Sequence, residues 1–238
     1  KLPHLKKGNS YLNFIASHDG IGMRPVEGIL NKTSIKNLFT RLKKNGSKFS
    51  YRKIQNQTKK VYEANITVFD ALYKSDFDKL GKFANERYIS AHSIMCALEG
   101  VPALYFNSLF GKSNDEAKYI ITGNNRDVNR YKWNEDNLIM RLKNEKSKQY
   151  IFYKNITNLL SIRRKHKAFH PNALRTTIDL GSKIFCLKRV SIDKKQTIIC
   201  ITNVTSMTQN PKLNKKYNTW KNLINPKIKF NRKDYFRL

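Results

Sequence analysis

The chain has 238 residues, of which 39% are hydrophobic and 11% aromatic, so it can bury a sizeable core and is not wholly disordered. Its net charge is +30, from 47 lysines and arginines against 17 acidic residues, but the basic residues are spread along the chain. Charge spread in this way is typical of a solvated surface, so we expect no nucleic-acid partner.

The first predicted element is a strand over residues 11–16, a short apolar run of sequence YLNFIA. It ends in Ser17-His18-Asp19-Gly20, so polar side chains appear abruptly where the strand stops. Residues 31–60 are rich in Lys, Asn and Ser and have weak periodicity. They predict a short helix near residues 35–42, followed by an excursion loop.

The middle of the chain predicts two strand-and-helix pairs. Apolar residues recur at helical spacing over residues 86–99, and Gly100 stands where a helix C-terminus favours glycine. The continuous apolar run at residues 101–106 suits a strand covered on both faces, as in a parallel sheet. A polar loop over residues 107–137 and a helix over residues 148–165 follow. This order is typical of the βα repeat of an α/β barrel or a doubly wound sheet.

The sequence changes character near its C-terminus. Residues 184–190 and 197–203 are short β-branched runs separated by Asp193-Lys194-Lys195, which predicts a hairpin, and residues 217–238 predict further short strands. We therefore expect the last units of a barrel in residues 1–173 and a small antiparallel β domain in residues 174–238.

The cysteines favour a reducing cytoplasm. Cys96, Cys186 and Cys200 stand singly, with no CxxC pair and no histidine at metal-ligand spacing, so the sequence indicates neither a zinc site nor a disulfide framework. No stretch approaches the roughly 20 apolar residues of a membrane span, and the start of the sequence lacks the apolar core of a secretory signal. We expect a cytoplasmic protein without a membrane partner.

Asp19 is the strongest candidate for chemistry. In barrel folds the carboxyl ends of strands present catalytic groups to the substrate. A carboxylate there can accept hydrogen bonds from neighbouring sugar hydroxyls, and the adjacent imidazole of His18 can donate one. Asp-Gly is also a common turn dipeptide, so spacing alone leaves a site and a simple turn both open.

Four segments together resemble a known family. Residues 14–28, of sequence FIASHDGIGMRPVEG, are similar to the seventh-strand region of the α-amylase superfamily in glycoside hydrolase family 13. The resemblance is strongest to its sucrose phosphorylase branch, of the glucosylglycerate phosphorylase and sucrose 6'-phosphate phosphorylase type. Residues 62–72 resemble the mobile active-site loop of that branch, residues 100–106 its eighth strand, and residues 125–133 the loop that closes its sugar pocket. The resemblance covers about residues 11–205, and the combination is specific.

The resemblance implies a fold and roles for several side chains. The fold would be α/β, the C-terminal portion of a (β/α)8 TIM barrel followed by a small antiparallel β domain. Asp19 would stabilise the oxocarbenium-like transition state, with His18 bonding a neighbouring hydroxyl. Arg130 would bind a far hydroxyl of the glucosyl unit, although a surface ion pair is the alternative. Tyr62 lies in the loop that exchanges acceptor for phosphate, with core packing as its alternative.

Three further residues concern the acceptor. Glu63 stands where true sucrose phosphorylases have glutamine, which favours the glycerate or phosphosugar branch. Arg24 and Glu27 follow the Asp19 segment and either contact the acceptor or pair with each other.

The implied activity is that of a glycosyl-transferring phosphorylase. It would cleave an α-glucoside such as glucosylglycerate with inorganic phosphate by a retaining double displacement, and release α-glucose 1-phosphate. The alternatives are phosphorolysis of sucrose or sucrose 6'-phosphate, hydrolysis or transglycosylation on the same fold and, more distantly, a basic nucleic-acid-binding module. No metal or organic cofactor is required. Because the superfamily carries its nucleophile and its acid/base ahead of this segment, we expect the isolated chain to be an inactive fragment.

Overall fold

The computed structural model describes the chain except for residues 1–2, 4, 7, 54–58, 212–219 and 227–238. It contains two compact units, each assembled from separated segments. Unit 1 comprises residues 1–13, 89–103 and 154–238, and unit 2 comprises residues 14–88 and 104–153. The chain passes from one unit to the other after residues 13 and 103, and within helices α3 (Ala84–Ala97) and α6 (Lys148–Lys165). The expected domain division at residue 173 stays a prediction.

Unit 2 is built on a three-stranded antiparallel sheet in the order β2–β4–β3. The strands are β2 (Ile21–Gly22), β3 (Lys48–Lys53) and β4 (Lys59–Asn65). In the register of β2 and β4, Ile21 faces Ala64 and Gly22 faces Glu63. This pairing brings the segment that follows Asp19 directly against the end of β4.

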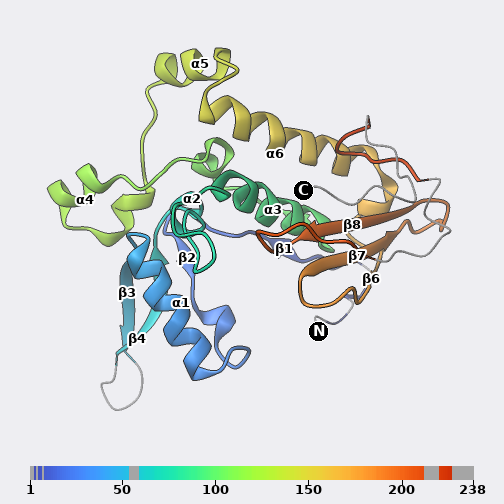
Figure 1. The fold of residues 1–238 in the computed structure, drawn as a ribbon, viewed down its shortest axis with the longest axis horizontal. Helices are drawn as coiled ribbons and strands as arrows, with labels where there is room; N and C mark the ends of the chain where they lie inside the picture. Colours follow the sequence, from blue (N-terminus) through green and yellow to red (C-terminus); the bar gives the residue numbers. More distant parts are fainter. Residues whose placement is uncertain (1–2, 4, 7, 54–58, 212–219, 227–238) are drawn as a thin grey trace. The chain divides into compact units, whose positions relative to one another are not determined.

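Helix α1 (Lys32–Lys44) lies beside the β3–β4 hairpin (Figure 1). It begins at Asn31, whose side chain accepts a hydrogen bond from the Ser34 amide at 2.8 Å, a common way to satisfy a free amide at a helix start. Its apolar face packs on the sheet and forms a core with Met23, Leu42, Ala64 and Ile66 at its centre. This core fixes the strand that carries Tyr62 and Glu63.

Short helical elements and an aromatic cluster complete the described part of unit 2. The helical elements are η1 (Arg24–Val26), α2 (Val68–Ala71), η3 (Phe106–Phe110), α4 (Glu116–Thr122), η4 (Asn125–Asn129) and α5 (Glu135–Lys143). Phe69, Tyr88 and Phe152 pack with ring centroids 4.7–5.8 Å apart. Gly111, at a φ of +57°, lies against the Phe152 ring, where a Cβ would approach to 2.1 Å.

Unit 1 contains a short parallel pair, β1 (Leu12–Asn13) with β5 (Val101–Pro102). Gly100, before β5, has a φ of +106°, and a Cβ there would lie 2.4 Å from the carbonyl oxygen of Tyr11. Only glycine allows this close approach between the end of α3 and the start of the pair.

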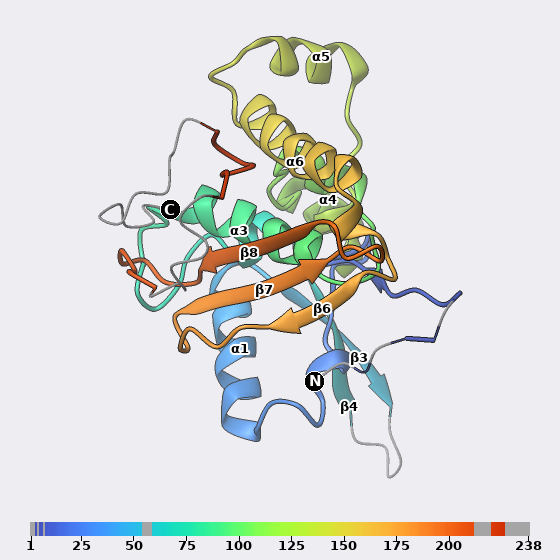
Figure 2. The ribbon, with the colours of Figure 1, turned by 90° about the vertical axis from the view of Figure 1, so that its right-hand side faces the viewer.

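A three-stranded antiparallel sheet also lies in unit 1 (Figure 2). Its strands, in spatial order, are β6 (Leu174–Thr177), β7 (Ile184–Val190) and β8 (Thr197–Asn203). The short helix η5 (Lys167–Phe169) packs Ala168 and Phe169 against Ile198 of β8. The predicted hairpin of residues 184–203 is therefore confirmed.

The two helices predicted at residues 86–99 and 148–165 are confirmed as α3 and α6. The strands predicted at residues 11–16 and 101–106 are much shorter, because only two residues of each pair in a ladder. The burial expected for these runs is wrong as well, because Leu12, Phe14, Val101 and Phe106 are exposed. An α/β fold with antiparallel sheets is thus observed, whereas the barrel stays a proposal.

Two predicted loops are wrong. The excursion loop after residue 42 contains the β3–β4 hairpin, and the polar loop of residues 107–137 contains η3, α4, η4 and the start of α5. The further strands expected in residues 217–238 fall mainly outside the described residues. Among the helices that the structure describes, none is long and apolar enough to cross a membrane.

Candidate functional site

Asp19 lies in a tight turn whose backbone is closely held. The amide of Ser17 donates to the Gly20 carbonyl at 2.9 Å, the Gly20 amide donates back at 3.2 Å, and the Asp19 amide donates to Ser17 Oγ at 3.2 Å. Gly20 has a φ of +118°, and a Cβ would lie 2.3 Å from the carbonyl oxygen of Ala64 on β4. The turn at Asp19-Gly20 is therefore observed, whereas a catalytic role for Asp19 stays a prediction.

The carboxylate of Asp19 is shared by three cationic or basic side chains. Nη2 of Arg130 donates to Oδ1 at 2.5 Å, Nε of Arg126 lies 3.6 Å from Oδ1, and Nε2 of His18 lies 3.3 Å from it. The Asp19 side chain is 21% exposed, Arg130 33% and His18 62%. The carboxylate is thus held by guanidinium groups but remains reachable from solvent.

Arg126 extends this cluster to β4. Its Nε and Nη2 donate to the two carboxylate oxygens of Glu63 at 3.1 and 3.0 Å, and Nη2 also donates to the Tyr62 hydroxyl at 3.1 Å. Two-pronged pairing of this kind is strong and directional. The hydrogen bond to Glu63 is the main reason that the pKa of Arg126 is raised above its usual value. Tyr62 and Glu63 therefore lie in the same cluster as Asp19.

Two buried amides hold the backbone beneath the cluster. Nδ2 of Asn65 donates to the Asp19 carbonyl at 2.8 Å, while its Oδ1 accepts from Ser50 Oγ at 2.8 Å. Nδ2 of Asn129 donates to the Ser17 carbonyl at 2.7 Å. Both asparagines are at most 3% exposed. No sequence pattern singles out these asparagines or Arg126, although all three lie within the segments that carry the family resemblance.

The side chains of Glu27 and Arg24 do not pair with each other, so that alternative is wrong. Glu27 instead binds Arg52 at 3.1 Å and Lys60 at 3.0 Å. These two cations face each other across β3 and β4, and Glu27 bridges them. The hydrogen bond from Lys60 is the largest cause of the lowered pKa of Glu27. Arg24 is exposed, and its contact with an acceptor stays a prediction.

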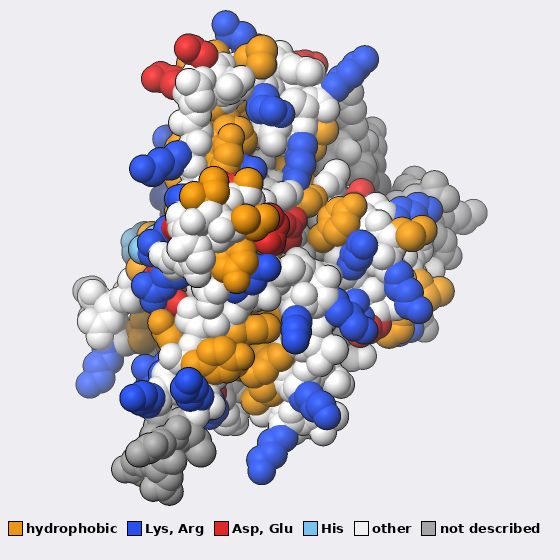
Figure 3. All heavy atoms as spheres, turned by 90° about the vertical axis from the view of Figure 1, so that its left-hand side faces the viewer, with side chains coloured by type: hydrophobic (Ala, Val, Ile, Leu, Met, Phe, Trp, Pro, Cys, Tyr) orange, Lys and Arg blue, Asp and Glu red, His pale blue; other side chains and the backbone are white. Residues whose placement is uncertain are grey.

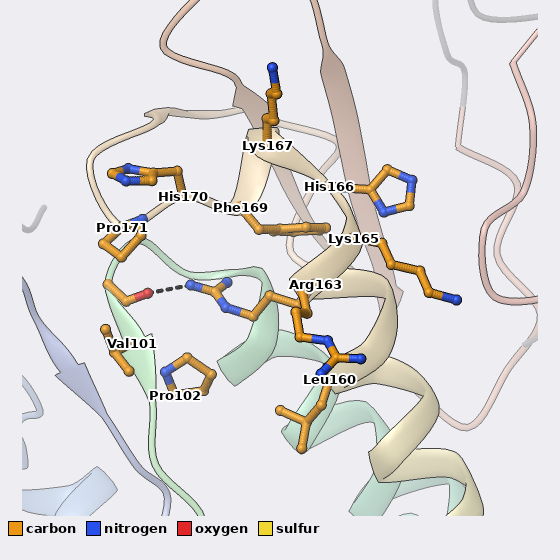
Figure 4. Close-up of a pocket in the computed structure, with 12 residues that line it drawn as sticks. Val101, Pro102, Leu160, Arg163, Lys165, His166, Lys167, Phe169, His170 and Pro171 are labelled. Carbon is orange, nitrogen blue, oxygen red and sulfur yellow. Dashed lines mark hydrogen bonds between the residues drawn. The ribbon is translucent and has the colours of Figure 1, made fainter.

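A cavity of about 540 Å³ lies in unit 1, and none of the candidate residues lines it. Its wall includes Val101 of β5 and the basic residues at the end of α6 (Figure 4). Lys165 and Lys167 point in different directions there, while Arg163 donates to a backbone carbonyl. The basic side chains therefore do not converge on a common ligand position.

Charge is distributed without a dominant stripe on the face drawn in Figure 3. Blue lysine and arginine side chains are scattered among apolar and neutral ones there. Among the residues that the structure describes, no group of three or more His, Cys, Asp or Glu side chains is placed to hold a metal ion.

Comparison with known proteins identifies the relatives of the chain. No protein-family model matches it. It is 31% identical over 201 residues to glucosylglycerate phosphorylase from Escherichia coli (strain K12), covering 84% of this chain and 35% of that protein. It is 32% identical over 200 residues to glucosylglycerate phosphorylase from Allomeiothermus silvanus, covering 84% and 35%. The chain is homologous to the sugar phosphorylases.

This sugar phosphorylase homologue spans about a third of the length of the curated relatives it matches. A sucrose phosphorylase from Agrobacterium vitis is 25% identical over 190 residues, covering 73% of this chain and 34% of that protein. Among solved structures, sucrose 6F-phosphate phosphorylase from Thermoanaerobacter thermosaccharolyticum matches with a TM-score of 0.62 at 18% identity, covering 81% of this chain and 39% of that one. That match shows a shared fold.

Proposed function

We propose that this chain supplies the part of a retaining glycoside phosphorylase that binds the glucosyl unit of the substrate. Such an enzyme cleaves an α-glucoside such as glucosylglycerate with inorganic phosphate and releases α-glucose 1-phosphate. The observation that carries the proposal is the pairing of Asp19 with Arg130 at 2.5 Å in a partly exposed cluster. In this proposal the barrel units occupy residues 1–173 and the β domain residues 174–238.

The geometry of Asp19 suits a carboxylate that grips a sugar ring. All three contacts to its side chain, from Arg130, Arg126 and His18, are made to Oδ1. In the described part of the chain, Oδ2 therefore keeps its lone pairs for a ligand, and a carboxylate oxygen accepts two hydrogen bonds well. Hydrogen bonds from ring hydroxyls that strengthen as positive charge develops on the sugar would favour the transition state over the bound substrate.

His18 and Arg130 flank this oxygen acceptor with donors. Arg130 keeps a fixed orientation through Asp19, and its guanidinium has further N–H groups to offer a sugar hydroxyl. His18 is the most exposed member of the cluster, as expected for a group that meets its ligand from solvent. The two carboxyl groups that perform the displacement, about 5 Å apart in retaining enzymes, belong to the part of the family that the resemblance places ahead of this segment.

Glucosylglycerate is the donor that the relatives favour. Three curated relatives at 31–32% identity are named glucosylglycerate phosphorylase, whereas relatives named sucrose phosphorylase are 24–25% identical. Glu63 supports the same choice. By the family resemblance, true sucrose phosphorylases have a glutamine at this position, and this chain has a carboxylate. Sucrose, sucrose 6'-phosphate and glucosylglycerol remain as competing donors, the last because one relative at 29% identity is named for it.

The test is product analysis with the full-length protein that carries these residues. Each of the four donors is incubated with and without inorganic phosphate, and α-glucose 1-phosphate and free glucose are measured. We expect phosphate-dependent α-glucose 1-phosphate from glucosylglycerate. Release of glucose at the same rate with and without phosphate would identify a hydrolase instead. Tight, salt-sensitive binding of unrelated DNA without turnover would favour the basic nucleic-acid-binding module.

Asp19→Asn tests the role of the carboxylate. The substitution keeps the shape of the side chain but removes the charge, so we expect turnover to fall by at least about 100-fold. Asp136→Asn, at an exposed position in the first turn of α5, is the matched control and should turn over normally. Normal turnover by Asp19→Asn would remove Asp19 from the site.

A further inference from the structure

Arg126 occupies the position between the sugar-gripping carboxylate and the strand that carries Tyr62 and Glu63. Its Nε is 3.6 Å from Asp19 Oδ1 and 3.1 Å from Glu63 Oε2, and its Nη2 is 3.1 Å from the Tyr62 hydroxyl. The side chain is 34% exposed, so one edge of the guanidinium faces solvent. No other described side chain forms hydrogen bonds or ion pairs with all three of these residues.

The cluster is electrically balanced by this one residue. Asp19 and Glu63 bring two negative charges, and Arg126 and Arg130 bring two positive charges. Without Arg126 the cluster would carry a net charge of −1, and Glu63 would lose its ionic partner and keep only the hydrogen bond from Asn65. A multiply charged anion that approaches such a cluster is repelled, whereas neutral water is not.

The other arginines near this segment are not placed to replace it. Nη2 of Arg130 donates to Asp19, and the Arg130 side chain forms no hydrogen bond or ion pair with the described residues of β4. Its Nε is buried without a hydrogen-bond partner. Arg24 is exposed, and in the described part of the chain its side chain forms no hydrogen bond or ion pair with Tyr62 or Glu63. The cation beside Tyr62 is therefore Arg126.

We propose that Arg126 determines whether phosphate or water accepts the glucosyl group, by keeping the acceptor side of the cluster from becoming negative. This inference rests on the proposed function, because it concerns the second half of the same reaction. Arg126 acts both as a positioning residue, through its fork on Glu63 and Tyr62, and as the positive charge nearest the incoming anion. A hydroxyl held by Arg126 at Tyr62 adds a donor for a phosphate oxygen.

The competing steps differ in the charge of the nucleophile. In phosphorolysis an oxygen of hydrogen phosphate bonds to the anomeric carbon while the bond from that carbon to the enzyme carboxylate breaks. The electron pair of the broken bond returns to the carboxylate, and the product leaves as the monoanion of α-glucose 1-phosphate. In hydrolysis the oxygen of neutral water bonds to the anomeric carbon while the same bond to the enzyme carboxylate breaks, and the proton of the water passes to the acid/base group, which is then a carboxylate. A change in local charge therefore alters the rate of phosphorolysis more than the rate of hydrolysis.

The experiment measures the ratio of α-glucose 1-phosphate to free glucose formed by the full-length protein at a fixed phosphate concentration. We expect Arg126→Gln to lower this ratio by about tenfold or more and to raise the KM for phosphate, while donor cleavage continues. Glu63→Gln removes a negative charge from the same pair and should raise the ratio. The double variant restores balance and should lie between the two. Because each ratio is internal to the active molecules, partial misfolding does not change it.

Two further variants separate charge from geometry. Arg126→Lys keeps the charge without the fork and should recover part of the ratio, and Arg141→Gln, exposed on α5, should leave it unchanged. A wild-type ratio in Arg126→Gln, or equal shifts in Arg126→Gln and Glu63→Gln, would overturn the inference. A wild-type protein that forms no α-glucose 1-phosphate from any donor would instead overturn the proposed function.

Discussion

Two pairs of arginines in this chain make opposite use of the same side chain. In unit 1, Arg163 and Arg189 are 9% and 0% exposed and donate to backbone carbonyls. In unit 2, Arg126 and Arg130 are 34% and 33% exposed and bind carboxylates. Burial among neutral acceptors defines the first pair, and accessible ionic contacts define the second.

The electrostatics of the two pairs differ accordingly. Burial lowers the pKa of Arg189 to about 10, with Arg163 contributing further repulsion. Arg189 donates to the carbonyls of Ala168, Ala97 and His170 at 3.2, 3.4 and 2.9 Å, so its guanidinium ties η5 and the end of α3 to the sheet. Arg126, in contrast, has a raised pKa because of Glu63. Burying the first pair costs desolvation free energy, which the hydrogen bonds to backbone carbonyls offset. The second pair keeps its charge available to a ligand.

The sharpest test of this contrast is Arg130→Lys. Lysine keeps the charge but loses the planar fork that orients Asp19, so we expect kcat/KM for the glucoside to fall by about 100-fold. The free energy of unfolding should change by less than about 1 kcal/mol, because the pair is partly exposed. Steady-state kinetics and urea denaturation measure the two effects, with Arg141→Lys as the exposed control. A stability loss without a kinetic loss would place Arg130 with the structural arginines.

Arg189→Met tests the other pair. Methionine fills a similar volume but leaves the carbonyls of Ala97, Ala168 and His170 without this donor, the first two in buried hydrogen bonds, so we expect the free energy of unfolding to fall by about 3 kcal/mol. Urea denaturation of the chain, followed by circular dichroism, measures the change. Arg164→Met, at an exposed position on α6, is the control and should change stability by less than about 0.5 kcal/mol. Equal effects at the two positions would contradict a structural role for Arg189.

Gly20→Ala tests whether the turn beneath the ionic cluster tolerates any side chain. The alanine Cβ would lie 2.3 Å from the Ala64 carbonyl oxygen at a φ of +118°, so we expect a stability loss of about 2 kcal/mol or more. Gly28→Ala is a matched control, since Gly28 also has a positive φ of +79° but nothing within 4 Å of its Cβ position. That variant should lose only about 1 kcal/mol. If Gly28→Ala proves as costly as Gly20→Ala, the backbone angle rather than the contact with β4 sets the requirement.

The elements that sequence predicted best are those whose signals are local. Helix α6 shows helical spacing over 18 residues, and the β7–β8 hairpin shows two β-branched runs around a polar turn. Helix α4 lay hidden in a polar segment, although Asp115 caps its start and Gly123 its end in the left-handed conformation. Cap residues predict such helices even where apolar periodicity is weak. The length of β1 and β5 depends on a partner strand, which no local pattern specifies.

Several residues of the candidate site could be named from the sequence, but the contacts between them could not. Asp19 and Arg130 were named from the sequence, and the structure brings them together across 111 positions of the chain. No sequence pattern predicts a role for Arg126, because a single arginine is not distinctive in a chain of net charge +30. Its importance appears only when Glu63, Tyr62 and Asp19 are seen to surround it. Long-range ionic contacts of this kind depend on the folded backbone.

Lys148 offers a third environment for a cation and the smallest predicted effect. Its Nζ lies 3.1 Å from the centroid of the Phe69 ring and donates to Ser113 Oγ at 3.2 Å. Burial lowers its pKa to about 8, while Asp70 on α2 opposes the shift and Lys112 adds to it. Between pH 8 and the ordinary lysine pKa near 10.5, the unfolded chain therefore binds more protons at this position than the folded protein.

The quantity to follow is the free energy of unfolding of the wild-type protein minus that of Lys148→Met. It should be constant below about pH 8 and rise between pH 8 and 10.5. The rise should be about 1 kcal/mol at most, because solvent screens the partly exposed amine. Urea denaturation of both proteins at intervals across this range measures the difference. Lys132→Met, at an exposed position before α5, is the control for removing a lysine from the surface. A difference for Lys148→Met that falls with pH would mean that the ring and hydroxyl contacts favour the charged amine, and would place Lys148 with Arg126 rather than with Arg189.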